Sequence, residues 1–246
     1  MDTGGGLAGP GRDVLTIPQV SIYADGRVIS QGAQIEIYPG AALPPLMLSR
    51  LSPAGLARVM DEAAVTGLTA GNRHFPMRGI ADVHTTTFTV AVGGETHVVT
   101  VDGLGLEAEH ADQFDATERQ ARQAMLDFQG ALTYLPPWLG TNLIADGLPY
   151  EFDELRIFAR PGLPPVEPDL VQPDMAWPLS GSLATIGEPY PMGEDARCVT
   201  VAGDDLQTLL PMVMGANQLT LWESGGERYE LLFRPLLPDE TGCPAA

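Results

Sequence analysis

The feature that most constrains the fold of this 246-residue chain is a repeated pattern of alternating apolar and polar residues. Pairs of such stretches are separated by a short segment that contains glycine. The longest runs from Val83 to Val92, breaks at Gly93-Gly94 and resumes from Thr96 to Val101. Similar pairs of stretches meet at Asp25-Gly26 and at Ser224-Gly225-Gly226. A period of two predicts half-buried strands, and Asp-Gly or Gly-Gly supplies the positive φ of a tight turn. The chain is therefore expected to contain several antiparallel hairpins.

Helices are expected between these hairpins. Ser52-Pro53 is a strong helix start, because a hydroxyl N-cap is followed by proline at the first helical position. Asp115-Ala116-Thr117-Glu118 resembles a capping box and precedes apolar residues at helical spacing. A third helix is expected to begin at a cap on Asp204, with Pro211 keeping it short or kinked. Together the elements predict an α+β fold with antiparallel sheets, each packed by a helix.

The composition of each segment predicts the domain organisation. The order strand, helix, hairpin occurs at Ile35–Val101 and again at Cys198–Phe233, so a twofold repeat is one interpretation. A separate strand is expected at Gln34–Tyr38. The chain divides into four predicted parts: a flexible glycine-rich tether at 1–12, an α+β domain at 13–160, a proline-rich strap at 161–178 and a smaller α+β subdomain at 179–246.

The charge of the chain excludes several classes of function. Asp and Glu number 32 against 13 Lys and Arg, which gives a net charge of −19, and the sequence contains no lysine. Negative charge repels phosphate backbones and anionic lipid headgroups, so no nucleic-acid partner is expected. The absence of lysine removes Schiff-base chemistry and a P-loop lysine. No apolar run reaches 18 residues, so no transmembrane segment is predicted.

The two cysteines, Cys198 and Cys243, leave two alternatives open. They are either unrelated buried thiols or one disulfide that fixes the C-terminal residues to a strand. The even count favours the disulfide, which would indicate an oxidising compartment. The first residues, Met1-Asp2-Thr3, lack the basic and apolar regions of a signal peptide, which fits a mature exported protein as well as a cytosolic one.

Three stretches are together similar to a known group of proteins. They are Pro18 to Ile29, which contains Tyr23-Ala24-Asp25-Gly26-Arg27-Val28-Ile29; Ala81 to Thr86; and a C-terminal set of Gly215 to Thr220, Trp222, Arg234 to Glu240 and Cys243. The pattern resembles uncharacterised exported, often lipoprotein-type, proteins of GC-rich Gram-positive bacteria, from Val14 onward. This resemblance implies export, a lipidated or cleaved N-terminus and a Cys198–Cys243 bridge, but no activity.

The candidate catalytic residues are His74, Asp82 and His84. His74 lies in a predicted loop from which it is able to approach the other two, as a two-histidine, one-carboxylate site. Ordinary loop and strand histidines are the favoured interpretation of the same residues. No HExxH or GxSxG motif occurs to support a known hydrolase class.

The densest acidic patch consists of Glu107, Glu109, Asp112 and Asp115. A calcium site is one interpretation of it. The spacing of a 12-residue calcium loop is missing, so a solvated acidic surface is favoured. Neither a metal nor a cofactor is therefore predicted.

These observations lead to one main expectation of function. We expect a non-enzymatic protein, extracellular or attached to the cell envelope, that binds a protein partner or a small ligand, with a lipid anchor on its native N-terminus as a further expectation. One alternative is an extracellular hydrolase with a nonstandard site at His74, Asp82 and His84. Another is a subunit of an extracellular assembly, in which a neighbour extends an exposed hairpin edge.

Overall fold

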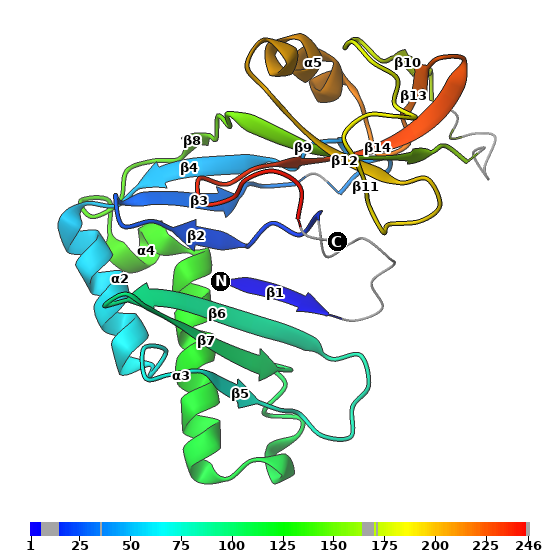
Figure 1. Cartoon of the computed structure of the whole chain (residues 1–246). Helices are drawn as coiled ribbons and strands as arrows, with labels where there is room; N and C mark the ends of the chain where they lie inside the picture. Colours follow the sequence, from blue (N-terminus) through cyan, green and yellow to red (C-terminus); the bar gives the residue numbers. More distant parts are fainter. Residues whose placement is uncertain (6–14, 35, 164–169, 171, 245–246) are drawn as a thin grey trace. The chain divides into compact units, whose positions relative to one another are not determined.

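The computed structural model describes residues 1–5, 15–34, 36–163, 170 and 172–244, and within them it confirms the α+β fold (Figure 1). The described strands form three sheets in which all neighbours are antiparallel except β5 with β7 and β10 with β13. The contacts divide the chain into two units. The first contains Met1–Ala8, Ile17–Gln31 and Leu46–Tyr150, and the second contains Gly9–Thr16, Gly32–Pro45 and Glu151–Ala246.

One sheet of the first unit is built around the longest predicted hairpin. Val92 pairs with Glu95, and Gly93 and Gly94 between them have φ of 63° and 84°, so the two-residue turn is confirmed. The positive φ at both positions is the reason that glycine is required there. The strand order is β1 (Asp2–Gly5), β6 (His84–Val92), β7 (Glu95–Asp102) and β5 (Arg73–Phe75).

The N-terminal residues belong to this sheet, so the predicted tether is wrong for residues 2–5. Thr3 pairs with Thr86 of β6, and their hydroxyl oxygens lie 3.2 Å apart. The glycine-rich composition predicted a flexible chain at these positions. Instead, the edge of β6 offers backbone hydrogen-bonding groups, and residues 2–5 pair with them as a strand. Residues 6–12 of the predicted tether lie outside the described residues.

The other sheet of the first unit begins with the hairpin at Asp25-Gly26. Gly26 has φ of 84°, and a Cβ there would meet the carbonyl oxygen of Leu51 at 2.7 Å, so glycine is required. The strand expected at Gln34–Tyr38 is wrong for its described residues, which form no strand, while Ile35 is not described. The strand order is β2 (Val20–Ile22), β3 (Arg27–Gln31), β4 (Leu46–Arg50) and β8 (Leu148–Pro149).

The two helices expected in the first unit begin at their predicted N-caps, Ser52 and Asp115. Ser52 Oγ accepts a hydrogen bond from the Gly55 amide at 3.1 Å, and Asp115 Oδ1 accepts one from the Glu118 amide at 2.8 Å. The helices are α2 (Pro53–Val65), the 3₁₀ helix η1 (Ala111–Gln113), α3 (Ala116–Thr133) and α4 (Leu135–Leu139). None of the described helices combines the length and the apolar character that a bilayer-crossing helix needs.

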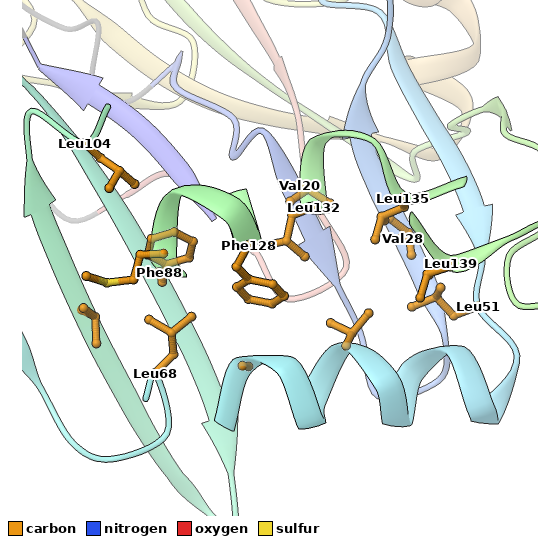
Figure 2. Close-up of a cluster of buried hydrophobic side chains, with 14 of the residues drawn as sticks. Val20, Val28, Leu51, Leu68, Phe88, Leu104, Phe128, Leu132, Leu135 and Leu139 are labelled. Carbon is orange, nitrogen blue, oxygen red and sulfur yellow. The ribbon is translucent and has the colours of Figure 1, made fainter. Parts of the chain in front are cut away.

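The core of the first unit joins side chains from both of its sheets and from its helices (Figure 2). Phe128 of α3 stacks on Phe88 of β6 with ring centroids 6.3 Å apart, and Val20 and Val28 of the hairpin are buried in the same cluster. Each such side chain contributes about 1.5–3 kcal/mol when fully buried. This core therefore includes side chains of β5, β6 and β7, and two of these strands, β5 and β6, carry the candidate histidines His74 and His84.

The second unit contains a six-stranded sheet with α5 (Gly203–Gly215) packed on one face (Figure 1). Ser224 pairs with Glu227 across Gly225-Gly226, so the predicted second Gly-Gly hairpin is confirmed. The strand order is β10 (Met175–Ala176), β13 (Leu221–Ser224), β14 (Glu227–Pro235), β9 (Glu154–Pro161), β12 (Arg197–Ala202) and β11 (Glu188–Pro189).

Two expectations about α5 are wrong. Ala202, not Asp204, occupies the N-cap, and no side chain caps this helix; Asp204 lies in the first turn, where its charge complements the helix dipole. Pro211 lies inside the helix, which continues to Gly215, so the short helix is wrong, while the other alternative, a kink at Pro211, stays a prediction. The helix persists because Leu206, Leu209 and Val213 are buried against the sheet, which offsets the roughly 3 kcal/mol cost of an internal proline.

The alternation of side chains gives the two faces of this sheet different roles. Leu155 and Ile157 of β9 join the core under α5 together with Trp222 of β13. Phe158, the residue after Ile157, faces the other side in the period-two pattern and clusters with Cys198. The second face therefore carries the cysteine bridge.

The domain boundaries differ from the predicted ones. β9 pairs with β12 and β14, so residues 151–160 belong to the second unit and not to the predicted 13–160 domain. Within the predicted strap, Met175 and Ala176 form β10, and residues 164–169 and 171 lie outside the described part. The repeat is not shown: β12 shares a sheet with the hairpin that follows it, whereas β4, before α2, lies in a different sheet from β6 and β7.

Candidate functional site

The three candidate catalytic residues have separate surroundings. His74 Nε2 lies 2.8 Å from Asp102 Oδ2, while His84 Nε2 lies 3.0 Å from the carbonyl oxygen of Leu104. Asp82 lies in the bend before β6 with φ of 59°. In the described part of the chain no hydrogen bond or ion pair joins Asp82 to either histidine, and no three His, Cys, Asp or Glu side chains form a metal-binding group.

Asp102 is the carboxylate partner that sequence reasoning missed. It ends β7, and the parallel pairing of β5 with β7 brings His74 beside it. Thr85 Oγ1 donates to Asp102 Oδ1 at 2.8 Å. Burial by itself would raise the pKa of Asp102, but the hydrogen bonds from Thr85 and His74, with the charge of His74, hold this pKa below its usual value. Parallel pairing between distant strands leaves no local sequence signal.

A buried arginine holds the backbone around this pair. Arg122 of α3 is fully buried, and its guanidinium donates to the carbonyl oxygens of Asp102 at 2.9 Å, Phe75 at 3.0 Å and Pro76 at 3.1 Å. It also lies over the ring of Phe114, 4.2 Å from the centroid. Its donors thus satisfy carbonyl groups at the ends of both β5 and β7, which keeps His74 and Asp102 in register.

The four acidic candidates do not share one set of contacts. Glu107 Oε1 lies 3.3 Å from Arg122 Nη1, and its Oε2 accepts from the Gly105 amide at 2.8 Å. Asp115 caps α3, whereas Glu109 and Asp112 are exposed. Two of the four carboxylates therefore stabilise local backbone structure.

Cys198 and Cys243 form a disulfide, as predicted, with their Cα atoms 6.0 Å apart. Two arginines on neighbouring positions of β9 and β14 hold the same C-terminal segment. Arg156 Nε donates to the Gly242 carbonyl at 2.7 Å, and Arg234 pairs with Glu240. Burial lowers the pKa of Arg156, and the adjacent Arg234 charge lowers it further. The bridge thus belongs to a C-terminal clamp.

The second unit contains a cavity of about 270 Å³, which we call the strap pocket. From β13, β14 and the residues before them it is lined by Gln218, Leu219, Leu221, Arg228 and Glu230. From the strap it is lined by Leu163, Leu170, Gln172 and Asp174. The four leucines supply an apolar lining and the remaining side chains supply hydrogen-bonding groups, a combination typical of small-molecule sites.

Each carboxylate of the strap pocket is paired with an arginine. Arg228 Nε lies 2.7 Å from Asp174 Oδ2. Glu230 accepts two hydrogen bonds from Arg160, at 2.9 Å each. Gln218 Oε1 accepts from the Gly40 amide at 3.3 Å, so its side chain is anchored while its amide nitrogen has no partner among the described residues. The pocket lining therefore combines paired carboxylates with donors that have no partner in the described part of the chain.

A second hollow lies in the first unit and differs in chemistry. Its lining includes Pro53, Leu56 and Met60 of α2, and its one charged residue, Asp25, is paired with Arg27 at 2.7 Å. This hollow offers apolar surface without an unpaired charged group. Because neither hollow includes His74, the His74–Asp102 pair lies outside both.

Comparisons with known proteins found no relative of this chain. No family model, no curated protein and no solved structure matches this chain. The resemblance to exported proteins of GC-rich Gram-positive bacteria stays a prediction.

Proposed function

We propose that this protein is a non-enzymatic, exported protein that binds a small ligand in the strap pocket. The single observation that carries the proposal is the pocket itself, where leucines lie beside Arg228 and Gln218, whose side chains keep donors that no other described residue engages. Apolar lining with a few fixed polar groups is what small-ligand sites share. Neither His74 nor His84 lines this pocket or the second hollow.

The compartment is part of the same proposal. A Cys198–Cys243 disulfide supports folding in an oxidising compartment, because cytosolic thiols are usually kept reduced. The net charge of −19 supports an acidic surface that stays soluble and repels anionic polymers. Attachment to the cell envelope through a lipid on the native N-terminus remains a proposal that mass spectrometry of the protein from its source organism tests.

The pocket proposal is tested with hexan-1-ol as an apolar probe. In two-dimensional amide NMR spectra, we expect saturable shifts at Gln218, Leu219 and Leu221. Leu221→Ser should weaken binding several-fold, because it removes apolar contact from the lining. Leu148→Ser is the matched control, since Leu148 is exposed on β8 of the other unit. Shifts confined to other residues, or none, would contradict the proposal.

The His74–Asp102 contact favours one second candidate, an acid–base hydrolase. His74 is 56 % exposed, and a carboxylate 2.8 Å from its ring orients it as a general base would be oriented. The measurement is hydrolysis of p-nitrophenyl acetate by wild type and His74→Ala. Under the binding proposal the two rates are equal, whereas a loss of turnover beyond tenfold in His74→Ala would favour the hydrolase.

A further inference from the structure

Resting on the pocket function proposed above, we propose that the strap pocket selects a small carboxylate with a short aliphatic chain. The inference starts from Arg228. Its Nε forms an ion pair with Asp174 Oδ2 at 2.7 Å, which places the guanidinium beside the pocket lining. In the part of the chain that the structure describes, Nη1 and Nη2 of Arg228 have no hydrogen-bond or ion-pair partner, and the side chain is 61 % exposed.

The carboxylates of the pocket are already neutralised. Both oxygens of Glu230 accept from Arg160, and Asp174 is paired with Arg228 itself. Among the described residues, the pocket's acids therefore leave the terminal nitrogens of Arg228 without a partner. The two terminal nitrogens of a planar guanidinium match the two oxygens of a carboxylate.

A second donor lies in the same lining. The side-chain oxygen of Gln218 accepts from the Gly40 amide, and the Gln218 amide nitrogen, which is a donor, has no partner among the described residues. The unused groups at Arg228 and Gln218 are thus both donors. A ligand that offers acceptors is favoured over one that offers an ammonium group.

The apolar lining and the size of the cavity limit the rest of the ligand. Leu219 and Leu221 are half-buried and lie beside these donors, so an aliphatic chain gains contact area there. The cavity of about 270 Å³ limits the ligand to a small molecule. Hexanoate, with eight non-hydrogen atoms, fits this size.

The experiment compares three probes with the same chain: hexanoate, hexan-1-ol and hexylammonium. Binding is measured by NMR titration against wild type, Arg228→Gln and the control Arg50→Gln, since Arg50 is exposed in the other unit. We expect hexanoate to bind wild type about tenfold or more tightly than hexan-1-ol, the size of a charge-assisted hydrogen bond. This preference should disappear in Arg228→Gln and persist in Arg50→Gln.

The outcomes separate the two proposals. If hexan-1-ol binds at the pocket and hexanoate binds no tighter, the carboxylate class is overturned and the pocket function stands. If none of the three probes shifts the pocket amides, both are overturned. Thermal unfolding of Arg228→Gln, expected to match wild type because this side chain is exposed, shows that any lost preference is local.

Discussion

The carboxylate of Glu240 accepts two hydrogen bonds from the guanidinium of Arg234, from Nη1 at 2.5 Å and from Nη2 at 2.6 Å. The Arg234 side chain is only 5 % exposed, and Arg156 lies opposite it on β9. Glu240 is therefore the carboxylate that compensates two neighbouring positive charges. Glu240 Oε2 also accepts from the Leu237 amide at 2.9 Å, which shapes the C-terminal segment.

Glu240→Gln should lower the free energy of unfolding by roughly 3 kcal/mol, because it leaves a buried charge without its partner. Urea unfolding followed by circular dichroism measures the change. Glu227→Gln is the matched control: Glu227 is exposed beside the hairpin turn and should change stability by less than about 0.5 kcal/mol. Equal effects of the two substitutions would show that the Arg234 pair is not a major source of stability.

Replacing both cysteines with alanine should destabilise the chain by about 4 kcal/mol, because the bridge closes a long loop in the unfolded chain. The bridged residues are 45 positions apart. The check is denaturant unfolding of the wild type with and without reductant, next to the Cys198→Ala/Cys243→Ala variant. Reductant should destabilise only the wild type. A wild type with two titratable thiols in the folded state would be inconsistent with the bridge.

Arg122→Met should destabilise the first unit by roughly 3 kcal/mol or more, because three carbonyl oxygens lose their buried donors. Arg122→Lys should recover only part of this, since an ammonium lacks the planar fork that reaches several acceptors. Hydrogen exchange of the β5 and β7 amides is the measurement. Arg50→Lys, at an exposed position, serves as control. Unchanged protection in Arg122→Met would argue against its role in holding these strand ends.

Asp102 should make the free energy of unfolding depend on pH under acidic conditions. Because its pKa is lower in the folded chain than its ordinary value near 3.8, the folded state binds this proton more weakly. The stabilisation is complete above that ordinary value and is lost as the pH falls through the lower folded value. Asp102→Asn removes this titrating carboxyl group and with it the pH-dependent stabilisation. We expect wild type to lose more stability than Asp102→Asn below about pH 4, and parallel curves from urea unfolding would refute the assignment.

Local chemistry explains which features were predictable. The turns at Gly26, Gly93-Gly94 and Gly225-Gly226 require a positive φ that glycine adopts without strain. The caps at Ser52 and Asp115 need only neighbours in sequence. By contrast, the N-cap position of α5 falls on Ala202, the last residue of β12, which the Asp204 signal does not indicate.

The candidate sites depend on contacts between distant residues. His74 and Asp102 are 28 positions apart and meet through a parallel strand pair. The strap pocket brings Asp174 to Arg228 and Gln218 to Gly40, separations that periodicity does not encode.

The amino-acid sequence alone determined the α+β class, the three glycine hairpins and the starts of α2 and α3, because these depend on backbone preferences within a few residues. Only the tertiary structure decided that residues 2–5 add a strand to β6, that His74 meets Asp102 and that the strap pocket exists. Those features arise when distant edges and side chains find partners within each packed unit, and the free energy that selects such partners depends on many contacts at once.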